Sequence, residues 1–205
     1  MHFLLSKGGL YKVYNNNLLY HGCIPLNEDG SFKSVKIYGR SYKGKALYEV
    51  LESYVRKGFY AIDEKERKRG KDMMWYIWLS ENSPLFGKDK MATFERYFLA
   101  EKETHKEKKN PYYDFLENDK VVDRILKEFG LEHSFSHIIN GHMPVKSKNG
   151  ENPMKCGGKV FVIDGGFSRA YQKQTGIAGY TLIYNSYGMI LSAHEPLNRK
   201  NQQLK

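Results

Sequence analysis

The pattern of apolar and polar positions divides the chain into two strand-rich parts on either side of a helical segment. Short β-prone runs occupy residues 10–25, where an asparagine cluster at 15–17 marks a turn. From His137 onward the apolar runs are again short, and glycine-rich turns separate them. Residues 43–130 instead carry apolar positions at helical spacing. We predict an α/β fold in which residues 43–130 form a helical insertion within a single partial domain, residues 1–205.

Two helices of this insertion have clear boundaries. Residues 43–57 place their apolar side chains on one face, and Gly58 lies where a C-terminal cap belongs. Residues 114–129 carry the most regular apolar stripe in the chain, and Gly130 follows it. We therefore expect both helices to end at glycine and to pack one face on the core.

Two other parts of the insertion are rich in large apolar residues. The run at 73–79 (MMWYIWL) is strongly apolar, so we expect it to be buried, and the charged run at 63–72 predicts a solvated surface before it. Residues 89–100 predict a further helix. Its inward-facing residues are expected to be Met91, Phe94, Phe98 and Leu99.

Two apolar runs end in a histidine beside a glycine, with a proline soon after. They are LLYHGCIP at residues 18–25 and IINGHMPV at residues 138–145. Glycine allows a tight turn at the end of such a strand, and a neutral imidazole held there can ligate a metal. A single histidine in this position is more often structural, but the matching contexts favour His21 and His142 as two ligands of one metal.

Further residues near the second motif suit the same site. The sequence VFVIDGGF predicts a buried strand that runs into Asp164, which either orients a histidine ligand or begins a turn. Lys146 and Lys148 follow the second motif directly, and Arg169 follows the glycines. These three basic side chains are candidates for binding a phosphate group.

Composition favours one class of binding partner but does not identify a particular partner. The 205 residues include 33 Lys and Arg against 23 Asp and Glu, a formal charge of +10. This excess favours anionic partners or is simply a solvated basic surface. Two cysteines make no disulfide framework, and no run is long enough for a signal peptide or a membrane span. We expect a cytoplasmic protein that does not contact a membrane.

Longer strings narrow the interpretation. The chain contains LYKVYNNNLLYHGCIPLNEDGSF, NSPLFGKDKMATFERYF, ETHKEKKNPYY and GENPMKCGGKVFVIDGGFSRAYQKQTGIAGYTLIYNSYG. These strings resemble class III fructose-1,6-bisphosphatase over nearly the whole chain. LLYHGCIP, INGHMPV and VFVIDGGF resemble the His-Gly, Gly-His-x-Pro and Asp-x-Gly motifs of the calcineurin-like metallophosphoesterases, the superfamily to which that enzyme belongs.

The resemblance implies a layered metallophosphoesterase β-sandwich with a dinuclear metal site, in which Mn²⁺ is the expected metal. By motif, His21 and His142 would ligate one of the two metals. The implied partner is a phosphorylated sugar, because the complete enzyme hydrolyses the 1-phosphate of fructose 1,6-bisphosphate in gluconeogenesis.

Three motifs that the resemblance requires do not occur in the sequence. They are Asp-x-His, Gly-Asp-x-x-Asp-Arg-Gly and Gly-Asn-His-Asp/Glu, which supply the bridging carboxylate and other ligands. We therefore expect an incomplete sandwich that corresponds to the C-terminal half of the enzyme, weak Mn²⁺ binding, and little activity unless a separate chain brings the N-terminal half.

Two alternatives remain open at this point. One is a non-catalytic basic module that binds RNA or another anion, although no nucleic-acid motif is recognisable. The other is a metallophosphoesterase that acts on a different phosphoester.

Overall fold

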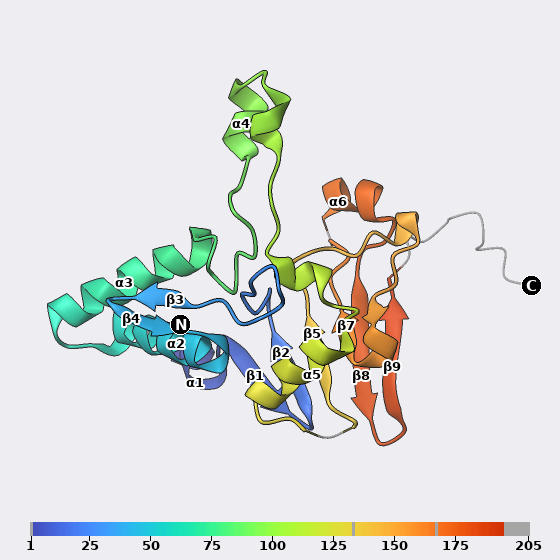
Figure 1. Cartoon of the computed structure of the whole chain (residues 1–205), viewed down its shortest axis with the longest axis horizontal. Helices are drawn as coiled ribbons and strands as arrows, with labels where there is room; N and C mark the ends of the chain where they lie inside the picture. The colour runs from blue at the N-terminus through green and yellow to red at the C-terminus, as the bar shows by residue number, and fades with distance from the viewer. Residues whose placement is uncertain (1, 133, 167, 195–205) are drawn as a thin grey trace, which may run out of the picture.

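The computed structural model describes residues 2–132, 134–166 and 168–194, with backbone only at 169–171 (Figure 1). Its centre is a five-stranded mixed sheet in the order β1-β2-β5-β7-β6, accompanied by helices and by two hairpins, β3–β4 and β8–β9. The predicted α/β class is confirmed. The strands are β1 Tyr11–Tyr14, β2 Asn17–Tyr20, β3 Val35–Ile37, β4 Arg40–Tyr42, β5 His137–Asn140, β6 Met154–Lys155, β7 Val160–Val162, β8 Tyr180–Asn185 and β9 Gly188–Ala193.

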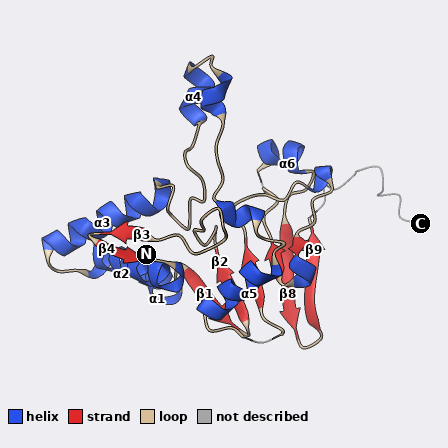
Figure 2. Cartoon of the chain, viewed as in Figure 1, coloured by secondary structure: helices blue, strands red, loops and turns tan. Residues whose placement is uncertain are grey.

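Helices lie to the left of the central strands, in front of them and above them in the view of Figure 2. Among the described residues, none of them combines the length and the apolar character needed to cross a membrane. The α-helices are α1 His2–Lys7, α2 Gly44–Tyr60, α3 Glu64–Leu79, α4 Thr93–Phe98, α5 Asp119–Glu128 and α6 Arg169–Thr175. Short 3₁₀ helices are η1 Lys102–His105, η2 Pro111–Asp114, η3 Ser147–Asn149 and η4 Cys156–Gly158.

The strand pairing brings the two histidine motifs together. Strands β1 and β2 form an antiparallel hairpin, and its turn places Asn15 and Asn16 at φ values of 47° and 59°, as a tight hairpin turn requires. Strand β2 then pairs in parallel with β5, and β5 with β7. Because parallel strands end at the same edge of a sheet, the loops after β2 and β5 begin side by side.

The main core lies between this sheet and α5, which crosses in front of it in Figure 1. Helix α5 buries the apolar stripe that the sequence predicted, and Gly130 follows with φ of 81°. The helix begins at Asp119 rather than at 114, because residues 111–114 form the 3₁₀ helix η2. Tyr180 and Leu191 of the β8–β9 hairpin also contact this core.

A second, smaller core lies between α2, α3 and the β3–β4 hairpin. We expected Gly58 to end the first helix, but α2 continues to Tyr60. Gly58 is buried where α3 crosses it, and a Cβ on Gly70 would overlap the Gly58 backbone. The glycine therefore serves close helix packing instead of capping.

The prediction that residues 73–79 are buried was wrong for most of them. In α3 only Met73 and Ile77 of this run are buried, whereas Trp75, Trp78 and Leu79 are more than half exposed. The charged residues that precede them lie largely at the surface, as predicted. One face of α3 contacts α2, and the described residues leave the opposite aromatic face uncovered.

The helix predicted over residues 89–100 is shorter, and its apolar residues point outward. Residues 88–109 form a projecting arm, with paired chain segments at its base and α4 and η1 at its tip (Figure 1). Phe94 and Phe98 stack on each other and are more than 70% exposed, and Met91 and Leu99 are also exposed. The inward orientation expected for these four side chains was therefore wrong.

Candidate functional site

The rings of His21 and His142 lie next to each other although the residues are 121 positions apart. The His21 Nε2 atom is 2.9 Å from the His142 Nδ1 atom, and the ring centroids are 4.8 Å apart. His21 is exposed and His142 is partly buried, so the pair is open to solvent on one side. The structure thus brings together the two residues that the sequence singled out.

Backbone contacts between the two loops hold the rings in place. The Gly141 N–H donates to the His21 carbonyl oxygen at 2.9 Å. Gly22 was expected to allow a tight turn, but neither it nor Gly141 has a positive φ. Gly22 instead admits the Pro84 carbonyl oxygen, which would lie 2.5 Å from a Cβ. His142 itself takes the left-handed φ of 67°, a strained conformation for a non-glycine residue.

A buried side-chain amide connects the two histidine motifs through hydrogen bonds. The Asn140 Nδ2 group, at the end of β5, donates to the Gly22 carbonyl oxygen and to the Tyr112 hydroxyl, both at 3.0 Å. The Tyr112 hydroxyl in turn lies 2.6 Å from the Tyr20 hydroxyl at the end of β2. This network links the ends of both strands just before the histidines.

The segment after α3 fixes the tautomer of His142. The His142 Nε2 atom lies 2.8 Å from the Phe86 carbonyl oxygen, which can only accept a hydrogen bond. His142 therefore carries its proton on Nε2, and the lone pair on its Nδ1 faces His21. Histidine ligands typically donate their second N–H to a backbone carbonyl in this way.

The electrostatic surroundings favour neutral imidazole at His21. Partial desolvation of the ring lowers its pKa, the adjacent His142 lowers it further, and Asp164 acts in the opposite direction. Only a neutral imidazole has the lone pair that a metal requires.

Asp164 lies beside the pair but also makes a turn. Its Oδ1 atom accepts a hydrogen bond from the Gly166 N–H at 2.8 Å, and its backbone carbonyl accepts one from Val145 at 2.7 Å. The turn interpretation of this residue is therefore confirmed, and the charge of its carboxylate also acts on His21. Its orientation of a histidine ligand stays a prediction.

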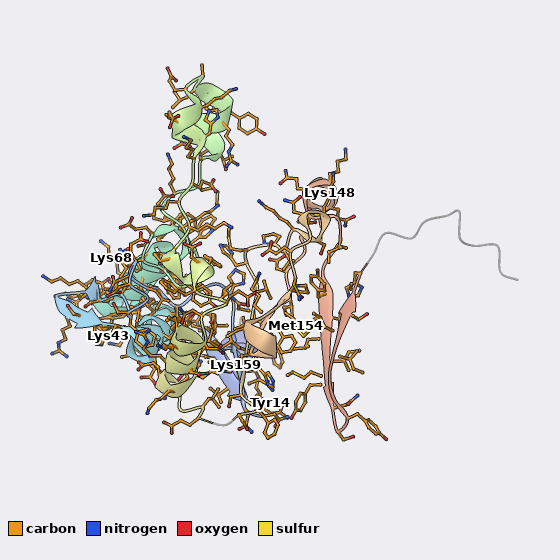
Figure 3. All side chains as sticks on the ribbon, turned by 45° about the vertical axis from the view of Figure 1, so that its right-hand side comes forward. Tyr14, Lys43, Lys68, Lys148, Met154 and Lys159 are labelled. Carbon is orange, nitrogen blue, oxygen red and sulfur yellow. The ribbon has the colours of Figure 1, made fainter. Side chains whose placement is uncertain are left out.

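The basic residues assigned to phosphate binding lie farther out. Lys146 and Lys148 are exposed on the loop between β5 and β6, and Figure 3 shows Lys148 at the outer end of that loop. Neither is among the described residues that line the cavity beside the histidines. Arg169 begins α6, and its side chain lies outside the described part of the structure.

A cavity of about 800 Å³ extends from the histidine pair toward α3. His21, His142 and Asp164 form its polar end. Its other lining residues are mostly apolar, and they include Ile77, Trp78, Leu85 and Phe86.

The histidine pair fits part of a metal site. Two nitrogens at adjacent corners of an octahedral metal site, each about 2.1 Å from the metal, lie about 3 Å apart, which matches the separation found here. The described residues contain no group of three or more histidine, cysteine or acidic side chains placed to hold a metal. The pair would therefore need further ligands to hold a metal tightly.

Comparisons with known proteins identify the family of the chain. The family model of Firmicute fructose-1,6-bisphosphatase matches residues 1–205. The chain belongs to this family. Among curated members, fructose-1,6-bisphosphatase class 3 of Clostridioides difficile (strain 630) is 61% identical over 203 residues, which are 98% of this chain and 31% of the relative.

Another class 3 member, from Clostridium novyi (strain NT), is 59% identical over 197 residues, or 96% of this chain and 30% of the relative. The chain thus spans about a third of the length of the curated family members it matches. No solved structure matches the chain.

Sequence reasoning missed the groups that act through the backbone. The Phe86 and Pro84 carbonyl oxygens contact the two histidine loops, and any residue type carries such an oxygen. Asn140 stands directly before Gly141-His142, and a polar residue at the end of an apolar strand was a signal that could have been used.

Proposed function

We propose that this chain supplies two metal-ligating histidines to a class 3 fructose-1,6-bisphosphatase, which hydrolyses the 1-phosphate of fructose 1,6-bisphosphate in gluconeogenesis. The single observation that carries this proposal is the 2.9 Å approach of the His21 and His142 rings in a chain of this family. The strained backbone of His142 and its fixed tautomer support it, since together they direct the Nδ1 lone pair of His142 toward the His21 ring.

The proposed metal is Mn²⁺, held by His21 Nε2 and His142 Nδ1 together with carboxylates from another polypeptide segment. Manganese accepts imidazole but prefers oxygen ligands, so two histidines alone would bind it weakly. When bound, the metal would polarise the phosphoryl oxygens and lower the pKa of a coordinated water.

The chain's own residues have supporting roles in this proposal. The Phe86 carbonyl oxygen holds the His142 ring. The Asp164 carboxylate, whose charge opposes the lowering of the His21 pKa, would likewise attract a cation bound beside that ring. Lys146, Lys148 and Arg169 would bind phosphate groups of the sugar from the loop and helix that follow the second motif.

The fold and the cysteines fit the same proposal. The central sheet would form one layer of a metallophosphoesterase sandwich in the complete enzyme. The free thiols of Cys23 and Cys156 suit a cytoplasmic location.

Phosphate release from fructose 1,6-bisphosphate in the presence of Mn²⁺ tests the proposal. The chain alone should release little phosphate. Co-expression with the part of the Clostridioides difficile relative that lies outside the matched third should raise the rate strongly. In that assembly, His21→Ala and His142→Ala should each lower the rate by about a thousandfold, as expected for loss of a ligand at a metal that stabilises the reacting phosphoryl group.

A matched control is His105→Ala, which removes a partly exposed histidine on the arm, away from the histidine pair, and should leave the rate unchanged. Full turnover by the chain alone would contradict the proposal. So would an assembly whose activity survives both histidine substitutions.

A further inference from the structure

The aromatic face of α3 has the character of an interaction surface. Trp75 and Trp78 are 61% and 64% exposed, and their ring centroids are 5.4 Å apart. The buried residues Met73 and Ile77 on the same helix contact the smaller core, so the tryptophans lie on the face turned away from it. Large apolar side chains that cluster at a protein surface mark sites where a partner binds.

This face continues into the cavity beside the histidine pair. Met74, Ile77 and Trp78 line the cavity from α3, and Leu85, Phe86 and Met143 line it from the loops. Lys88 is a cationic side chain of the lining, and its charge is paired with Glu107 at 2.8 Å. A sugar bisphosphate carries several negative charges, so a groove of this composition suits apolar polypeptide better.

The position of the groove and the net charge of the chain indicate which polypeptide the groove binds. His21, His142 and Asp164 lie at one end of it, where the additional metal ligands must arrive. Those ligands are carboxylates in a manganese site, and a chain with a formal charge of +10 attracts an acidic partner. More than two thirds of the Clostridioides difficile relative lies outside the match, so that enzyme has ample chain to fill a groove of this size.

We infer that this groove is the docking surface for the segment that carries the missing carboxylates. Met74, Ile77 and Trp78 line it from α3, and Leu85, Phe86 and Met91 line it from the segment after α3. The occupant is an apolar stretch bordered by Asp or Glu, and it covers Trp78 while placing its acidic end beside the histidine pair. This inference rests on the proposed function, because it states where the segment with the remaining ligands of the same metal site binds.

Co-expression of the tagged chain with the unmatched part of the Clostridioides difficile relative, followed by purification in EDTA, tests the inference without metal. The relative's segment should copurify with the chain. Hydrogen exchange of the α3 backbone near Trp75 and Trp78 should slow in the complex. Trp78→Lys and Met74→Lys should each weaken the association by at least about tenfold, as loss of a central apolar contact does.

The matched control is Tyr187→Lys, which places the same charge on an exposed aromatic position of the β8–β9 turn and should leave the association unchanged. Because lysine substitutions at the surface can disturb folding, circular dichroism of each variant alone should match the original chain. A second measurement uses the chain alone: a fluorescent apolar dye should bind the groove, and Trp78→Lys should abolish its binding.

The outcomes separate this inference from the proposed function. Copurification that depends on Trp78 but yields no phosphatase activity with Mn²⁺ would support the docking surface and refute the function. Activity in an assembly that is insensitive to Trp78→Lys and Met74→Lys would overturn the docking surface alone. Failure to copurify would also overturn it, as would a dimer of the chain that dissociates on Trp78→Lys, because a second copy would then be the occupant.

Discussion

The sheet region and the α3–arm region contain similar apolar side chains but place them differently. Around the sheet, the aromatic side chains of Tyr20, Tyr48, Tyr112 and Phe129 are buried and contact one another. On α3 and the arm, tryptophan and phenylalanine side chains lie mostly in solvent. Apolar content alone therefore does not indicate whether the described part of this chain buries a side chain.

The boundary between these regions passes through the candidate metal centre. His21 and His142 follow strands of the sheet, whereas Phe86, which orients His142, belongs to the segment that leads from α3 to the arm. The pairing of β2 with β5 thus sets the distance between His21 and His142. The α3–arm region, through the Phe86 carbonyl oxygen, holds the His142 ring. The following predictions test how far the two regions differ.

The largest contrast is expected between two phenylalanines. Phe129→Ala removes a buried ring that contacts Tyr11 and Tyr48, and it should lower the free energy of unfolding by about 3 kcal/mol. Phe98→Ala removes an arm side chain that is 79% exposed, and it should change that free energy by less than about 0.5 kcal/mol. Urea unfolding of both variants measures the difference, and equal losses would show that the comparison is wrong.

Gly70→Ala should have the next largest effect. The added Cβ would overlap the backbone of Gly58 where α2 and α3 cross, so the helices must separate, at a cost of about 2–3 kcal/mol. Lys68→Ala, on the exposed face of the same helix, is the matched control and should be nearly neutral (Figure 3). A stable Gly70→Ala variant would mean that the helix crossing is looser than described.

Asn140→Ala should cost about 2 kcal/mol, because it removes the donor to Gly22 and Tyr112 in a buried setting. The exposed Asn149→Ala is its control. Chemical denaturation gives the cost. Nuclear magnetic resonance should also show that the two histidine rings move apart, and an unchanged ring environment would rule out the linking role assigned to Asn140.

The smallest effect concerns the base of the arm and depends on pH. Burial raises the pKa of Glu107, but hydrogen bonds from Lys88 and the Ala92 N–H, with nearby positive charge, bring it below its usual value. A carboxylate with a lowered pKa stabilises the fold above its unfolded pKa, and this contribution is lost as pH falls through the folded pKa.

Glu107→Gln should therefore lower the free energy of unfolding by about 1 kcal/mol at pH 7. Below the folded pKa of Glu107, the variant and the original chain should be equally stable. A difference that persists in strongly acidic solution would show that the side chain acts by packing instead of by charge.

Sequence reasoning succeeded where local rules and burial agree. The turn at Asn15 and Asn16, the stripe of α5 and the strand before His142 follow from residue type and spacing alone. The approach of His21 and His142 was also predictable, because similar strand endings point to the same sheet edge.

The same reasoning failed where a neighbour decides the outcome. Gly58 looks like a cap unless Gly70 is known to cross it. Trp75 and Trp78 look buried unless it is known that no described residue covers this face of α3. The hydrogen bond between His142 and Phe86 could not be predicted from residue type, because the Phe86 backbone carbonyl accepts it.

The most direct test of the proposal that His21 and His142 share a metal is paramagnetic broadening of histidine ring signals by Mn²⁺ in the ¹⁵N-labelled chain. Substoichiometric Mn²⁺ should broaden the signals of His21 and His142 together while those of His2 and His105 stay sharp, and His142→Ala should abolish the effect on His21. Broadening that reaches all histidines equally, or that persists at His21 in the variant, would contradict a metal shared by the two rings.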